Sequence, residues 1–353
     1  MDFGLTEEQV ELAGLTRKIL AGRDAPWGDL AAAGVLAAGL PAALGGAGLG
    51  LLEQCSVLIE LGRAACDVPY LASVVLGAGA LATFGTAGQR ERWAVPAGQG
   101  SAVLTAALAE EDGDDPRAPS ARAERADGRW VLSGVKTAVD AAPEADLFLV
   151  PCATPDGVRV FLVTPSDAGV SVEPQQLTDF ASAGRVVLSR VGLDDDRVLG
   201  GAGVADWLVA RATVGLCAAQ SGVIERALEL TAEHAKSRVA FGRPIGSFQA
   251  VTQRLADAYV DVEAVRLTMW QAAWLLSSGE PGSDAAVAVA KFWAAEAGHR
   301  VAHTAVHVHG GIGIDVTYPV HRFFVAAKRH EFALGGATAQ LLRIGDALAG
   351  QVL

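Results

Sequence analysis

The sequence predicts an α+β protein in three parts: an N-terminal all-helical domain over residues 1–98, a middle β domain over 99–203 and a C-terminal four-helix bundle over 204–353. Three observations support this order. Helical spacing of apolar side chains runs through the first part. Short alternating runs, separated by turn residues, follow Pro96. Helical spacing then returns at Asp206 and persists to the end.

The N-terminal part begins with Thr6-Glu7-Glu8-Gln9, the spacing of a capping box that starts a helix. Further helices are expected over 51–64 and 70–84. Residues 31–52 carry no charged side chain, yet Pro41 and the glycines at 45, 46, 48 and 50 interrupt them, so a membrane-spanning helix is not expected. The acidic N-terminus lacks the basic start of a signal peptide, and a cytoplasmic protein is predicted.

The middle part predicts a compact barrel or sandwich of short strands. Turns are expected at Asp127-Gly128, at Pro155-Asp156-Gly157 and at Asp167-Ala168-Gly169. The expected strands cover residues 103–108, 129–132, 147–151, 158–164, 170–172 and 185–191.

The C-terminal part predicts four long helices joined by short connections, which is typical of a bundle. They are expected over 206–236, over 247–276, over 284–307 and from about 318 to the end of the chain.

Composition excludes several classes of function. A net charge of −12 disfavours nucleic acid as the main partner, because phosphate binding needs a basic surface. The four cysteines lack metal-ligand spacing and are expected to be buried thiols in a reducing compartment. No metal site is predicted, and His303, His321 and His330 are interpreted as structural.

The segment Ser237–Gln249 carries the strongest functional signal. It reads Ser-Arg-Val-Ala-Phe-Gly-Arg-Pro-Ile-Gly-Ser-Phe-Gln between two long helices, and His309-Gly310-Gly311-Ile312-Gly313 follows the third helix. A guanidinium pairs with phosphate oxygens through two directed donors, and glycines let backbone amides approach an anion closely. An isolated arginine at a helix end would be a surface residue, so the prediction depends on the whole string.

Together these motifs resemble the acyl-CoA dehydrogenase family, which are FAD enzymes. Asp127–Lys136 is similar to the family's strand-turn-strand in the β domain, and Leu44–Gly50 to its glycine-rich connection. The resemblance implies that an adjacent subunit's FAD is held through its pyrophosphate and adenine. The cofactor-binding residues that it implies are Arg238, Phe241, Gln249, His307, Gly310, Gly311 and Thr338, with His307 standing where the family usually has Gln.

Three segments depart from the family's pattern. Its wall segment, Lys-x-Trp-Ile-Thr, reads Lys136-Thr137-Ala138-Val139-Asp140 here, so both flavin-facing side chains are missing. Its Thr-Glu-Pro loop reads Ala109–Asp115 and contains extra carboxylates. Gly336 stands at the position of the usual catalytic glutamate, so the catalytic base is unknown. Glu233 and Glu331 are each expected to be ordinary exposed helix carboxylates.

The FAD-binding motifs are retained and the catalytic base is missing. This combination favours one hypothesis: a degenerate, glutamate-lacking subunit of a hetero-oligomeric acyl-CoA dehydrogenase. It would lend part of an FAD site to a catalytic partner that oxidises an acyl-CoA between its α and β carbons. Fatty-acid or steroid side-chain catabolism and electron transfer to an electron-transfer flavoprotein are implied. Two alternatives stay open: a homo-oligomeric dehydrogenase that uses Glu331, Glu233 or a substrate-borne group as its base, and a non-catalytic acyl-CoA-binding scaffold.

Overall fold

The computed structural model describes residues 4–22, 26–111, 113, 115–179 and 181–350. The chain forms two compact units, which are described separately. The helix unit comprises Met1–Leu20, Cys55–Cys66 and Val214–Leu353, and the sheet unit comprises Ala21–Gln54 and Asp67–Thr213. The domain boundaries at residues 98 and 203 stay a prediction.

The N-terminal helices follow the sequence pattern. The capping box at Thr6 is confirmed: its backbone N–H donates to Gln9 Oε1 at 2.8 Å, and its hydroxyl accepts from the Gln9 N–H at 3.3 Å. The helices predicted over 51–64 and 70–84 are present, the second beginning as a wider π-helix. The helical elements are α1 (Glu7–Gly22), α2 (Pro26–Ala32), α3 (Leu51–Ala64), a π-helix (Tyr70–Ala78), α4 (Gly79–Phe84), α5 (Ala87–Gln89), a second π-helical turn (Arg90–Ala94) and α6 (Val95–Gly98).

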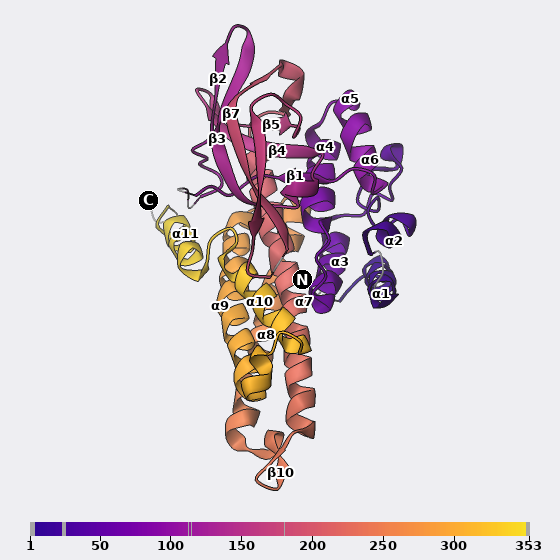
Figure 1. Ribbon diagram of the computed structural model, residues 1–353, viewed down its shortest axis with the longest axis vertical. Coiled ribbons are helices and arrows are strands. Elements are labelled where there is room, and N and C mark those ends of the chain that lie inside the picture. The colour runs from indigo at the N-terminus through magenta and orange to yellow at the C-terminus, as the bar shows by residue number, and fades with distance from the viewer. Residues whose placement is uncertain (1–3, 23–25, 112, 114, 180, 351–353) are drawn as a thin grey trace. The chain divides into compact units, whose positions relative to one another are not determined.

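The sheet unit contains one twisted, mainly antiparallel sheet with the order β6-β7-β3-β2-β4-β5-β8, while β1 pairs in parallel with β4 (Figure 1). All six predicted strands are present. The strands are β1 (Leu104–Ala106), β2 (Arg122–Ala126), β3 (Arg129–Asp140), β4 (Leu147–Thr154), β5 (Gly157–Val163), β6 (Val170–Gln176), β7 (Ser182–Leu193) and β8 (Val198–Leu199).

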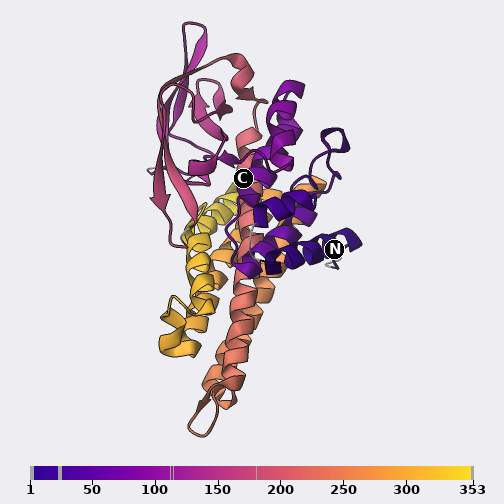
Figure 2. The same cartoon turned by 45° about the vertical axis from the view of Figure 1, so that its right-hand side comes forward.

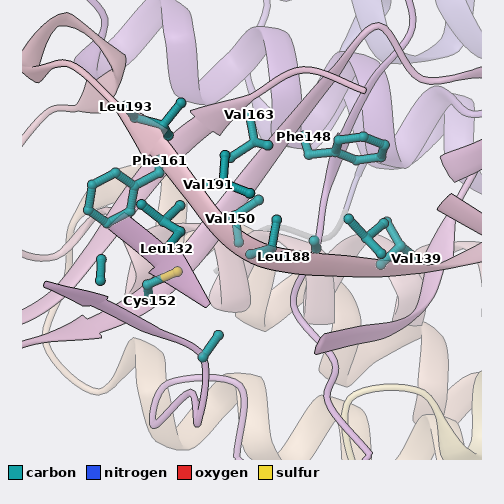
Figure 3. Packing of buried hydrophobic residues seen from close by; sticks show 14 of the residues in the cluster. Leu132, Val139, Phe148, Val150, Cys152, Phe161, Val163, Leu188, Val191 and Leu193 are labelled. Atoms are coloured by element: carbon teal, nitrogen blue, oxygen red, sulfur yellow. The ribbon is translucent and has the colours of Figure 1, made fainter. Parts of the chain in front are cut away.

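The short strand β8 was not predicted, and two further strands differ from expectation. β2 was not predicted, because its sequence Arg-Ala-Glu-Arg-Ala exposes three charged residues and its only fully buried side chain is an alanine. β3 is much longer than residues 129–132, and register shifts between Lys136 and Val139 let it continue through an irregular stretch. Trp130 lies edge-on to Phe161, with ring centroids 5.4 Å apart. The sheet's core is aromatic and aliphatic, and Figure 3 shows Phe148 and Phe161 among its aliphatic side chains.

Three of the four predicted bundle helices are confirmed with ends within a few residues: α7 (Val204–Ser237), α8 (Gln249–Ser278) and α9 (Ser283–His309). The fourth prediction is wrong. The terminal segment forms two helices, α10 (Pro319–Phe332) and α11 (Ala337–Gly350). Left-handed backbone at Leu334 (φ 59°) and Gly335 (φ 92°) ends the first, because that conformation cannot continue a right-handed helix.

Helix α7 is long and apolar enough to cross a membrane by length and composition, but 78% of its most apolar window is buried inside the protein. Close packing explains this composition. A Cβ on Gly222 of α7 would lie 2.0 Å from the Ile59 carbonyl oxygen of α3, so glycine is needed where the two helices meet. Interior packing of this kind is typical of a core helix.

Candidate functional site

A short β-hairpin joins α7 to α8, and three of the seven predicted FAD contacts, Arg238, Phe241 and Gln249, lie in it or beside it. β9 (Val239–Ala240) pairs antiparallel with β10 (Arg243–Pro244). The turn between them, Phe241 (φ 52°) and Gly242 (φ 80°), has two left-handed residues, as two-residue hairpins require. Both views show this hairpin at the far end of α7 and α8 (Figure 1, Figure 2).

The backbone at Arg238 is held from both sides while its side chain is exposed. The Arg238 N–H donates to the His234 carbonyl at 2.8 Å, and its carbonyl accepts from the Ile245 N–H at 2.8 Å. Among the described residues, the guanidinium has no hydrogen bond or ion pair. Gln249 begins α8 and is also exposed. A cation so placed can bind an anion without first breaking an internal pair.

Phe241 is 95% exposed at the hairpin tip and lies edge-to-face with Phe248, with ring centroids 6.0 Å apart. The Arg243 guanidinium lies 4.3 Å from the centre of the Phe248 ring. An exposed aromatic ring beside two arginines offers both a flat apolar surface and positive charge, the features needed by an adenine and its phosphates.

The glycine loop begins where α9 ends at His309. Gly310 has φ 65° and ψ −141°, a conformation that only glycine adopts readily. A Cβ on Gly310 or Gly311 would meet nothing within 4 Å, so the backbone here borders open space. His307, one turn earlier, is exposed. The loop can therefore present backbone groups and an imidazole to a ligand.

A pair of stacked histidines brings the end of α7 and the glycine loop together. The rings of His234 and His309 are 4.3 Å apart and inclined by 25°. His234 lies one helical turn before Arg238, and His309 directly precedes Gly310. Burial lowers the pKa of both imidazoles, and the positive charge of Arg238 contributes at His234. The sequence analysis missed His234, although its spacing of four residues from Arg238 was a usable signal.

Gly336 and Thr338 lie where α10 gives way to α11, and no described contact joins them to the hairpin or to the glycine loop. Gly336 has an ordinary φ, and a Cβ there would make only an ordinary contact of 3.7 Å with the Glu331 carbonyl oxygen. The position can thus carry a side chain without backbone strain. Thr338 is exposed in the first turn of α11.

The two candidate relocated bases differ. Glu233 is 66% exposed, as predicted. The expectation of an exposed carboxylate at Glu331 is wrong, since its side chain is only 14% exposed. Its oxygens lie 2.5 Å from Lys328 Nζ and 3.2 Å from His299 Nδ1, because the end of α10 packs against α9.

In the sheet unit, a buried ion pair holds the wall segment. Lys136 is fully buried and its Nζ lies 2.6 Å from Glu110 Oε1. Glu110 also accepts from the Ser120 N–H and hydroxyl and from the Ala121 N–H. Burial by itself raises the pKa of Glu110, but the hydrogen bonds from Lys136 and Ser120 outweigh it and hold the pKa below its usual value.

The wall itself presents little chemistry. Ala138 is exposed in a left-handed conformation (φ 47°), and its N–H donates to Gln175 Oε1 at 2.8 Å. Asp140 ends β3 half-buried. Of the extra carboxylates predicted nearby, Glu111 is paired with Arg185 at 3.0 Å, while Asp112 and Asp114 lie outside the described residues. Thus the framework is present without an aromatic ring or hydroxyl at its functional positions.

The described residues contain no group of three or more His, Cys, Asp or Glu side chains that could hold a metal ion. All four cysteines are free thiols. Burial raises the pKa of Cys152 and of Cys217 to about 12, so neither is a reactive thiolate near neutral pH.

Family models describe nearly the whole chain: the acyl-CoA dehydrogenase N-terminal domain matches residues 7–101, the middle domain 105–191 and the C-terminal domain 200–349. The chain belongs to the acyl-CoA dehydrogenase family. It is 47% identical to the acyl-CoA dehydrogenase FadE27 of Mycobacterium tuberculosis, with 99% of each chain covered. It is 33% identical to FadE28 of the same organism, covering 98% of each.

Chains from two solved structures that pair different polypeptides are similar to this chain. A chain of the ChsE4-ChsE5 complex from Mycobacterium tuberculosis superimposes with a TM-score of 0.94 at 47% identity, covering 99% of both chains. A chain from a variant of the Tcur3481-Tcur3483 steroid ACAD gives a TM-score of 0.93 at 40% identity, covering 98% of this chain and 99% of that one.

Acyl-CoA dehydrogenases are FAD-dependent, and the two units fit that cofactor unequally. In the helix unit, an exposed guanidinium, an exposed phenyl ring and an open glycine backbone suit the pyrophosphate and adenine. In the sheet unit, Ala138 and Asp140 offer no ring or hydroxyl to an isoalloxazine. The individual site residues therefore stay predictions, but the described geometry suits the cofactor only at the helix-unit end.

Proposed function

We propose that this chain is the non-catalytic half of a hetero-oligomeric acyl-CoA dehydrogenase in the cytoplasm. The observation that carries the proposal is a contrast. Arg238 and the Gly310-Gly311 backbone form an exposed anion-binding end, whereas Ala138, Asp140 and Gly336 leave the chain's own flavin half without a ring, a hydroxyl or a base. The anion-binding end could therefore hold part of an FAD that belongs to a partner subunit, whereas this chain's own flavin half lacks the groups for catalysis.

The relatives support a mixed assembly. Both solved structures named above are described as pairs of different polypeptides, and one is called a steroid ACAD. The substrate class that we propose is an acyl-CoA with a bulky acyl group such as a steroid side chain. The complex would introduce an α,β double bond and deliver the electrons to an electron-transfer flavoprotein.

Bound FAD supplies the hydride acceptor in this chemistry. Arg238 would pair with its phosphate oxygens, Phe241 would offer an apolar surface to its adenine, and the Gly310-Gly311 amides would bind its pyrophosphate. The α-proton needs a positioned carboxylate, and Gly336 has none to offer. The partner subunit therefore supplies the base.

A relocated base within this chain is disfavoured by the contacts of its two candidates. Glu331 is paired with Lys328 at 2.5 Å and lies 3.2 Å from His299, so its carboxylate is not held free beside a substrate. Glu233 is exposed to solvent, 3.8 Å from Arg226. Glu331 is thus occupied by its ion pair and Glu233 lies in solvent, so neither is a free carboxylate shielded from water, which proton abstraction in this chemistry requires.

Flavin stoichiometry tests the proposal. The chain is purified alone and after co-expression with a glutamate-containing family member of the same genome, and FAD is measured by visible absorbance. We expect little FAD on the isolated chain and about one FAD per heterodimer. One FAD per isolated chain would contradict the lending role, and no FAD in either preparation would favour a scaffold.

A further inference from the structure

A cluster of buried polar side chains lies inside the helix unit, away from the exposed hairpin. It joins α7, α9, α10 and α11 at one place, the end of α10 and the bend of residues 333–336 that leads into α11. Its members are Gln220, Lys291, His330 and Gln340, all of which make hydrogen bonds. Such groups cost free energy to bury unless they are paired, so their convergence needs a reason.

Lys291 is the central member. Its side chain comes from α9, is fully buried, and donates from Nζ to the carbonyl oxygens of His330 at 2.9 Å and Glu331 at 3.1 Å. These carbonyls belong to the last turn of α10, where no further helical N–H is available to them. An ammonium there also faces the negative end of the helix dipole.

The bend beyond α10 is held at nearly every carbonyl. The Arg329 carbonyl accepts from the Ala333 N–H at 3.1 Å, and the Phe332 carbonyl accepts from the Gly335 N–H at 3.2 Å. Gln340 Nε2 donates to the carbonyls of Leu334 and Gly335, each at 3.2 Å. Two buried side chains, one from α9 and one from α11, therefore clamp the bend from its two ends.

Gln220 of α7 braces the same turn. Its Oε1 lies 3.0 Å from His330 Nδ1, and its Nε2 donates to the Ala294 carbonyl at 3.1 Å. Gly298 makes room for this amide, since a Cβ there would lie 1.8 Å from Gln220 Nε2. Burial lowers the pKa of His330 to about 3, so the imidazole is a neutral donor from Nδ1.

We propose that Lys291 is a positioning residue whose buried ammonium sets the end of α10, and with it the bend that carries Gly336 and leads to Thr338. Only the functional roles of Gly336 and Thr338, in and after the bend, rest on the proposed function. The charged and titratable groups around Lys291 are Cys217 on α7, Glu331 on α10 and Arg343 on α11.

Burial distinguishes positioning from stabilisation. An ammonium taken wholly out of water is costly, and replacing a buried charge by an apolar group of similar volume is often neutral or stabilising. Losing the ammonium should therefore loosen the bend without lowering global stability. A residue present only for stability would show the opposite pattern.

The test compares Lys291→Met with a matched control, Lys328→Met, in the full chain complexed with its glutamate-containing partner. Lys328 sits on α10 and pairs with the Glu331 carboxylate, but caps neither carbonyl. Hydrogen exchange is followed by mass spectrometry in peptides covering 333–340 and, as a reference, 238–248. For Lys291→Met we expect about tenfold faster exchange in 333–340 alone, with the melting temperature within about 3 °C of wild type. The control should leave the exchange of 333–340 unchanged.

Unchanged exchange at 333–340 in Lys291→Met, or faster exchange throughout the bundle with a large fall in melting temperature, would overturn the inference. Equal acceleration in Lys328→Met would overturn it as well. Should Lys291→Met fail to fold, Lys291→Gln keeps an uncharged donor, and at least threefold acceleration confined to 333–340 is then expected. Exchange can be measured whether or not the complex holds FAD, so this outcome is separate from that of the proposed function.

Discussion

The hairpin end of the helix unit and the wall of the sheet unit differ in what they offer to the FAD that we propose is bound. At the hairpin, the predicted FAD-binding side chains Arg238 and Phe241 are present and exposed, with few contacts to the rest of the chain. At the wall, the framework is intact, with Lys136 buried on Glu110, while the functional position is an alanine. The ion pair at the wall therefore supports folding even without a flavin-facing ring or hydroxyl, because losing one partner would leave the other charge buried and unpaired.

Removing the wall's buried cation should have the largest effect. Lys136→Ala would leave the Glu110 carboxylate buried without its cation, and we expect a loss of about 3–5 kcal/mol in the free energy of unfolding, measured by urea denaturation. Lys136→Met with Glu110→Gln serves as the comparison and should lose less. If the single variant were as stable as wild type, the wall framework would no longer be needed for folding.

In the helix unit, the depressed pKa of Lys291 makes stability depend on pH. Its folded value of about 8 lies below its ordinary value of 10.5, so the unfolded chain binds more protons between these pH values. The free energy of unfolding of wild type relative to Lys291→Met should therefore rise from pH 8 to 10.5, by about 3 kcal/mol. Parallel denaturation curves at each pH measure this, and a flat difference would argue against a buried ammonium.

Arg238→Ala tests whether the exposed guanidinium beside the hairpin contributes to FAD affinity. Because a charge-assisted arginine–phosphate contact contributes about 1.5–3 kcal/mol, FAD affinity of the co-purified complex should fall about 10- to 100-fold. Titration of the deflavinated complex with FAD measures it. Arg243→Ala, on the same hairpin but stacked on Phe248, is the matched control and should lose less affinity. Equal losses would point to general positive charge rather than to a specific contact.

Gly336→Glu places a carboxylate at the position of the family's usual catalytic glutamate. Gly336 lies outside the left-handed region and a Cβ there makes only an ordinary contact of 3.7 Å, so we expect a change of less than about 1 kcal/mol in the free energy of unfolding. The isolated variant should still lack dehydrogenase activity, because its wall has no flavin-facing ring. Turnover of an acyl-CoA by the isolated variant, followed with an artificial electron acceptor, would show that the wall is sufficient as it stands.

Phe241→Ala should have the smallest effect on folding. Since the side chain is 95% exposed, the free energy of unfolding should stay within about 0.5 kcal/mol of wild type, while FAD affinity falls severalfold through loss of the apolar surface. Thermal unfolding and FAD titration on one preparation separate the two effects. A large loss of stability would mean that the ring is covered in the assembly.

Much of the fold could be predicted from local pattern. The long helices α7, α8 and α9 have sustained helical spacing, and the hairpin has its turn residues at Phe241-Gly242. Two features of the fold could not be predicted in this way. The charged strand β2 looks like a surface loop because most of its side chains are exposed, although it pairs with the adjacent strand β3 across the turn at Asp127-Gly128. The break between α10 and α11 went unseen, because hydrogen bonds from Lys291 and Gln340 close it.

The sequence by itself determined the family, the order of the three predicted parts, the string from Arg238 to Gln249 and the glycine at position 336, since these depend on residue identity and spacing. Only the tertiary structure decided that Glu331 is paired rather than free, that His234 stacks on His309, and that a lysine from α9 holds the end of α10. The reason is physical. Burial and pairing arise from residues far apart in the chain, and a side chain's protonation and freedom depend on those neighbours.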